Sequence, residues 1–173
     1  MKIFSYTFRG AEEYDTKIFP VLESFFTDVL ADPEGRYQIA VDEAILNALR
    51  YGKQGYDSEK VDVEIRLTES DITTVIISDS RLFDVSSFRA NLRRLAANPQ
   101  LANMRWGEYT AYLQRSRGYW LMLQFSEYVY LAASGKRVSL VSRIPFRVDY
   151  VLHDRIKDLV PRLFIESKDG VIS

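Results

Sequence analysis

Hydrophobic and polar residues alternate without a fault along residues 61–67, which is typical of a strand with one buried face. Residues 2–8 alternate in the same way, and residues 72–78 form a more apolar segment directly after the first. The polar turn at residues 69–71 predicts a hairpin between the last two segments. We therefore expect an antiparallel sheet with one face turned to a core.

Two stretches repeat apolar residues at helical spacing. The first runs from about Ala11 to Leu30, and Pro20 either bends this helix or marks its true start. The second runs from about residue 36 to residue 50, with Gly52 as a natural stop.

The C-terminal third resumes the strand pattern after a short helix. Gly118 opens a helix that reaches about Phe125, and residues 128–132 and 137–144 predict a second hairpin. A helix from about residue 153 to residue 163 and a polar tail complete the chain. Helices placed between antiparallel hairpins predict an α+β fold with helices covering one face of the sheet.

The segment 80–117 is unusually basic. Ser86 or Ser87 is expected to cap a short helix that ends near Asn98. Seven arginines against Asp84 and Glu108 give this segment a local charge of +5, in a chain whose net charge is −1. A solvated basic face and a docking surface for an acidic partner both fit this pattern. The arginines are Arg81, Arg89, Arg93, Arg94, Arg105, Arg115 and Arg117.

Composition narrows the chemistry. The 173 residues suffice for one domain. There is no cysteine, which excludes disulfides and a thiol nucleophile, and the one histidine, His153, excludes a His-rich metal site. The slightly acidic balance argues against direct nucleic-acid binding as the main task. Without a long apolar run or a signal-like N-terminus, we expect a cytoplasmic protein with no membrane contact.

Glu43 and Asn47 are four residues apart on the second predicted helix and therefore share a face. A carboxylate can accept a proton from a hydroxyl or a water, and an amide oxygen is a suitable ligand for Mg²⁺. Such a pair is also common at the solvated edge of an ordinary helix. The wider sequence context favours the functional interpretation.

The string Glu43-Ala44-x-x-Asn47-Ala48-x-x-Tyr51-Gly52 resembles the N-box of the GHKL (histidine-kinase-like) ATPase superfamily, and it is most similar to that of the anti-sigma-factor serine/threonine kinases. Asp79 falls where that family has an Asp-x-Gly-x-Gly box. Residues 116–122 partly match a later glycine box, and residues 135–141 match the closing hairpin.

The resemblance covers about residues 1–144 and leaves 145–173 as a C-terminal extension of the same domain. It implies a two-layer α/β sandwich of the Bergerat type, with a mixed, mainly antiparallel sheet and helices on one face. It also implies a bacterial signalling protein that binds ATP and Mg²⁺ and acts on, or sequesters, a protein partner such as a sigma factor or its antagonist. A homodimer is compatible with the family.

The resemblance assigns roles to five residues. Asn47 would bind Mg²⁺ and Glu43 would orient or deprotonate the attacking hydroxyl or water. Asp79 would accept a hydrogen bond from the adenine amino group. Gly118, at a helix N-terminus, would receive phosphate, and Arg117 would reach the γ-phosphate.

The sequence also departs from the family. Ser80-Arg81-Leu82-Phe83 follows Asp79 where the family has glycines, and bulky aromatic residues follow Gly118. In an alternative interpretation, Asp79 is a turn residue, Gly118 only starts a helix, and the chain is a non-catalytic protein-binding module that no longer binds nucleotide. The aromatic residues between 106 and 130 suit core packing better than base stacking.

Overall fold

The computed structural model of this chain describes residues 1–80, 84–111, 117–167 and 170–172, and its fold is α+β. In chain order the elements are β1 (Lys2–Arg9), α1 (Gly10–Glu13), the π-helical turn η1 (Tyr14–Ile18), α2 (Phe19–Leu30), α3 (Arg36–Tyr51), β2 (Lys60–Leu67), β3 (Asp71–Ser78), α4 (Val85–Ala97), α5 (Trp106–Thr110), α6 (Arg117–Phe125), β4 (Tyr128–Ala132), β5 (Arg137–Arg143), α7 (Asp149–Leu152), α8 (Ile156–Leu159), the 3₁₀ turn η2 (Val160–Arg162), β6 (Leu163–Ser167) and β7 (Gly170–Ile172).

The seven strands within the described residues form one sheet in the order β1-β2-β3-β5-β4-β6-β7. Every neighbouring pair is antiparallel except β4 and β6, which run parallel. Val63 on β2 faces Tyr6 on one side and Ile76 on the other, so the alternating segments are paired in a register that turns their apolar residues to one face. The sheet is thus mixed and mainly antiparallel, as the sequence predicts.

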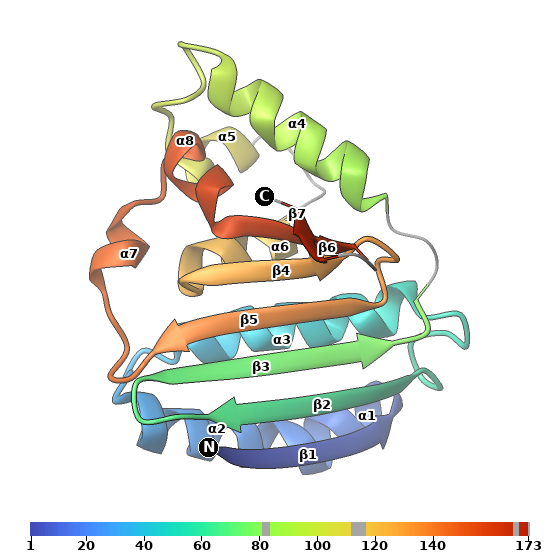
Figure 1. The fold of residues 1–173 in the computed structure, drawn as a ribbon. Helices are drawn as coiled ribbons and strands as arrows, with labels where there is room; N and C mark the ends of the chain where they lie inside the picture. Colours follow the sequence, from blue (N-terminus) through green and yellow to red (C-terminus); the bar gives the residue numbers. More distant parts are fainter. Residues whose placement is uncertain (81–83, 112–116, 168–169, 173) are drawn as a thin grey trace.

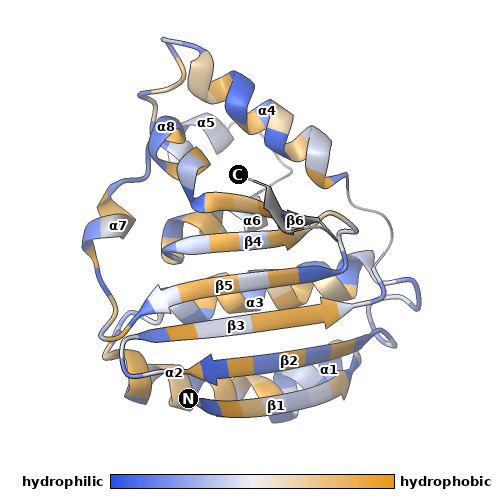
Figure 2. Cartoon of the chain, in the orientation of Figure 1, coloured by the Kyte–Doolittle hydropathy of each residue, from blue (hydrophilic) through white to orange (hydrophobic). Residues whose placement is uncertain are grey.

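Helices α1, α2, α3 and α6 lie against one face of the sheet, and within the described residues the opposite face of β1, β2, β3 and β5 carries no helix (Figure 1). Strand β2 alternates hydrophobic and hydrophilic residues along its length, in keeping with one covered and one open face (Figure 2). Helices α4, α5 and α8 gather at the β6 end of the molecule. The prediction that helices cover one face of the sheet is therefore confirmed for α1, α2, α3 and α6.

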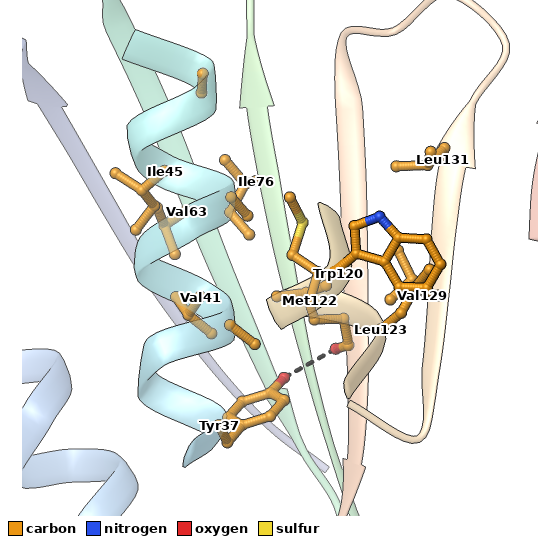
Figure 3. Packing of buried hydrophobic residues seen from close by; sticks show 14 of the residues in the cluster. Tyr37, Val41, Ile45, Val63, Ile76, Trp120, Met122, Leu123, Val129 and Leu131 are labelled. Atoms are coloured by element: carbon orange, nitrogen blue, oxygen red, sulfur yellow. Dashed lines mark hydrogen bonds between the residues drawn. The ribbon is translucent and has the colours of Figure 1, made fainter. Parts of the chain in front are cut away.

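Side chains of α3, α6 and the inner face of the sheet fill the core (Figure 3). Tyr37 is fully buried, and its hydroxyl donates to the carbonyl oxygen of Leu140 at 2.9 Å and lies 3.0 Å from Thr74 Oγ1. These bonds satisfy the phenol inside the core and fix the first turn of α3 above the central strands.

Pro20 lies in the first turn of α2, which agrees with the second of its two predicted roles, the start of a helix. Two other predicted boundaries are corrected by the structure. Helix α4 is capped by Asp84, which accepts a hydrogen bond from the Ser87 amide, and not by Ser86 or Ser87. The helix expected over residues 153–163 shrinks to two short turns, and the polar tail instead supplies β6 and β7.

Helix length also bears on membrane contact. The 16 residues of α3 rise about 24 Å at 1.5 Å per residue, and several of them are charged. Within the described ranges, no helix combines the length and the apolar character that a bilayer crossing needs.

Candidate functional site

Helix α3 presents Glu43 and Asn47 to the first turn of α6, where Gly118 lies directly against them. A Cβ atom at Gly118 would lie 2.7 Å from Glu43 Oε2 and 2.9 Å from Asn47 Nδ2. The close approach is made possible by small residues, because Ala44 and Ala48 occupy the same surface of α3. Three of the five residues assigned by the resemblance are therefore brought together by the fold.

The hydrogen bonding of the Asn47 side-chain amide bears on whether a ligand could bind here. Its Nδ2 atom is buried and has no hydrogen-bond partner within the part of the chain that the structure describes. An unpaired buried donor costs about 1–3 kcal/mol. An acceptor on a bound molecule would remove this cost, so the Asn47 amide is a group that a ligand could use.

The space beside Asn47, however, is very small. The cavity between α3, α6 and the sheet has a volume of about 30 Å³, roughly that of one water molecule in the liquid. Pockets for small-molecule ligands measure about 300–1,000 Å³. The residues that line the cavity are Ala44, Asn47, Ala48, Tyr51, Ile76, Ser78, Ser80, Tyr119, Met122, Gly135, Lys136 and Val138.

Two side chains of α6 limit the space beside Asn47. Tyr119 and Met122 line the cavity from the helix side, and Tyr119 also packs on Phe88 of α4, with 4.9 Å between ring centroids. Burial raises the pKa of the Tyr119 phenol above its usual range. In this arrangement the residues present do not fit ATP, since the adenosine and the phosphates would need the volume that these side chains occupy.

Asp79, to which the resemblance assigns the contact with adenine, follows β3 and does not line the cavity beside Asn47. It lies instead in an open hollow with Ile77 and Gln54. Ser78 lines both this hollow and the cavity, and Ser80 lines the cavity. Its carboxylate pairs with Lys136 Nζ at 2.5 Å and Lys53 Nζ at 3.2 Å. These two lysines, Lys136 foremost, hold the pKa of Asp79 below its usual range.

Glu59 organises this corner of the molecule, and no pattern in the sequence marks it. It is fully buried, and its carboxylate accepts hydrogen bonds from the backbone amides of Gln54 at 3.0 Å and Asp79 at 3.1 Å. A Cβ atom at Gly52 would lie 2.3 Å from Glu59 Cγ. The glycine of the N-box-like string is thus explained by packing against Glu59, which ties the end of α3 to the end of β3.

The arginine-rich segment is only partly described. Arg117 begins α6, but its side chain lies outside the described residues, as do Arg81 and Arg115 entirely. Arg105 pairs with Asp154 at 3.1 Å, so one positive charge of the segment is balanced by a carboxylate from the C-terminal extension. On α4, Arg93 and Arg94 are exposed.

Comparison with known sequences brings in no further assignment. No protein-family model and no curated protein matches this chain.

Within the described ranges, no three His, Asp or Glu side chains come together as a metal site.

The two tryptophans pack in the core. Trp106 stacks on Trp120, and both are buried, as the packing interpretation of the aromatic residues predicts. His153 is exposed, at the end of α7.

Proposed function

We propose that this chain is a bacterial cytoplasmic signalling module with a histidine-kinase-like ATPase fold of the Bergerat type, which no longer admits nucleotide and acts by binding a protein partner. The observation that carries the proposal is the cavity of about 30 Å³ beside Asn47, filled from α6 by Tyr119 and Met122. The pairing of Asp79 with two lysines supports it, because an adenine amino group would have to compete with Lys53 and Lys136 for that carboxylate.

The order of elements supports the fold type. A first strand and a long helix precede α3, two strands separate α3 from the arginine-rich segment, and α6 is followed by the closing hairpin β4–β5. This is the order that the resemblance implies for residues 1–144. Residues 145–173 add β6 and β7 to the edge of the same sheet.

The partner we propose is an acidic protein surface that meets the arginine-bearing side of α4. Arg93 and Arg94 are exposed there, and Asp84, the acidic residue at the start of the helix, is engaged in capping it. Basic residues on one exposed helix favour a partner of opposite charge and speed its association at low salt.

A calorimetric titration of Mg²⁺ and ATP into the full chain tests the central claim. We expect no heat of binding up to millimolar ATP, since the cavity would have to expand about tenfold before it reached the usual size of a ligand pocket. Micromolar binding, about −8 kcal/mol, would overturn the proposal. If ATP did bind, the Asn47→Ala variant would show whether it binds beside Asn47. Asn103→Ala, at an exposed asparagine, is the matched control.

The second candidate is an ATP- and Mg²⁺-binding serine/threonine protein kinase. The contact of Gly118 with Glu43 and Asn47 favours it, because the three residues assigned to phosphate and Mg²⁺ chemistry lie together. Binding that Asn47→Ala abolishes and Asn103→Ala preserves would select this candidate, and phosphorylation of a partner would then be the next property to measure.

A further inference from the structure

A second and larger cavity lies between α2 and α3, on the other side of α3 from α6. Its volume is about 240 Å³. Phe26, Leu30 and Tyr37, all buried, line its inner part, and the exposed side chains of Glu34 and Ile39 lie at its border. The cavity therefore has an apolar wall and an opening to solvent.

The charges that line this cavity have one sign. The lining residues include Glu23, Asp32, Glu34 and Asp42, and no lysine, arginine or histidine is among the lining residues that the structure describes. Arg36, outside the lining, pairs with Asp32 and Glu34 at the rim. The balance that remains inside is negative, which favours a cationic occupant.

Gln38 provides an independent sign of a missing partner. It is 5% exposed, it lines the cavity, and its Oε1 atom has no hydrogen-bond partner within the described part of the chain. A buried amide oxygen is an acceptor, so the absent group is a donor. Buried polar atoms without partners are rare in folded proteins and often mark a ligand or water.

The carboxylate of Asp42, also among the lining residues, lies beside Gln38. It accepts hydrogen bonds from the Gln38 amide and from the Tyr14 hydroxyl, and both go to Oδ1. Within the described residues Asp42 has no ion pair, so Oδ2 is left for a further donor. A single N–H-rich cation could thus bond to Gln38 Oε1 and to Asp42 Oδ2.

We propose that this cavity binds a small primary amine in its ammonium form, with the ammonium group between Gln38 Oε1 and Asp42 and the apolar body against Phe26 and Tyr37. The cavity volume of about 240 Å³ lies just below the usual range of about 300–1,000 Å³ for pockets that bind drug-sized ligands, which favours a small ligand. This inference does not rest on the proposed function, since the cavity lies away from Asn47.

Benzylamine and benzyl alcohol are the matched probes, because they share size and ring and differ in charge. With the isotope-labelled full chain at pH 7.5, we expect saturable amide shifts around Gln38 and Tyr37 with benzylamine, and at least tenfold weaker binding of benzyl alcohol. Equal binding of the two probes, or shifts confined to other parts of the chain, would overturn the proposal.

Asp42→Asn tests the charge without removing the local hydrogen bonds, because the Asn Oδ1 can still accept from Tyr14 and Gln38. We expect benzylamine to bind at least tenfold more weakly to this variant and benzyl alcohol to bind as before. The matched control is Asp28→Asn, at an exposed carboxylate of α2 outside the lining, which should bind both probes like the wild type. An unchanged affinity for benzylamine in Asp42→Asn refutes the site.

The pH dependence of benzylamine affinity tests the ion pair with Asp42. A purely structural role for Asp42 would leave this affinity unchanged with pH. The pKa of Asp42 is raised to about 6 by burial, against the hydrogen bonds from Tyr14 and Gln38, and Glu23 on α2 and Glu43 on α3 raise it further. Benzylamine affinity should therefore fall about tenfold between pH 7.5 and pH 5. An affinity that does not change over this interval contradicts an ion pair with Asp42.

Discussion

At the scale of single residues, Asp42 has a measurable effect on stability. Its pKa is about 6 in the folded chain against 3.8 for an ordinary aspartate, so the folded state binds the proton more tightly. The stability that protonation contributes is full below about pH 4 and is lost as the pH rises through 6. Asp42→Asn should raise the free energy of unfolding by roughly 3 kcal/mol at pH 7.5 and by little at pH 4, as measured by urea titration.

Asp62 is the control of opposite sign. Its pKa is lowered, chiefly because the Thr7 hydroxyl donates to it at 2.6 Å. Asp62→Asn should therefore lose stability relative to the wild type at pH 7.5 and not at pH 3. If both variants shifted stability in the same direction at every pH, charge burial would not be the cause.

The sequence predicted the contacts between residues that helical spacing determines, and it did not predict the contacts that loops determine. Glu43 and Asn47 share a face of α3 because they are four apart, and the structure brings Gly118 to them. The surroundings of Asp79 could not be predicted, because Lys53 and Glu59 reach it from the loop before β2 and Lys136 reaches it from the turn before β5. Its assigned contact with adenine stays a prediction.

At the scale of elements, three glycines give a graded test of packing between helices and loops. A Cβ at Gly10 would lie 2.1 Å from the carbonyl oxygen of Asp57, and Gly10 has a φ of +70°. At Gly52 the Cβ meets the buried Glu59, and at Gly118 it meets only the ends of two side chains. We expect Gly→Ala to cost most at Gly10, about 3 kcal/mol or more, less at Gly52 and least at Gly118.

Thermal and urea unfolding of the three variants measure this order. Gly107→Ala is the control, because a Cβ there meets nothing within 4 Å. A larger loss at Gly118 than at Gly10 would mean that Glu43 and Asn47 cannot move aside, and that the junction of α3 and α6 is more rigid than its side-chain contacts indicate.

The elements that were predicted well are those whose periodicity is strong. Residues 61–67 and 72–78 lie within β2 and β3, and the second helix was placed to within a residue of α3. The tail was missed because β6 is short and its pairing partner is β4, some thirty residues upstream. Nothing in a five-residue segment distinguishes a short strand from a helix end until its neighbour in the sheet is known.

At the scale of the whole molecule, the C-terminal residues close one edge of the sheet. Leu163 and Ile165 are buried, and Phe164 stacks on Tyr130 with 5.0 Å between ring centroids. A chain that ends after Arg162 should lose about 3–6 kcal/mol from the two buried side chains and expose the edge of β4.

Light scattering and urea unfolding should then show a less stable protein that self-associates. A chain that ends after Ser167 keeps β6 and serves as the control, and we expect it to remain closer to the wild type. If the shorter chain proved as stable and as monodisperse as the control, the pairing of β4 with β6 would not contribute to stability.

The buried Glu59 also links segments that are distant in the sequence. It holds the amides of Gln54 and Asp79, while its own carbonyl accepts from the Gly10 amide at 3.0 Å. The loop before β2, the end of β3 and the start of α1 are thereby fastened to one residue. We therefore expect these three segments to open together and not one at a time, since displacing Glu59 would release all of them.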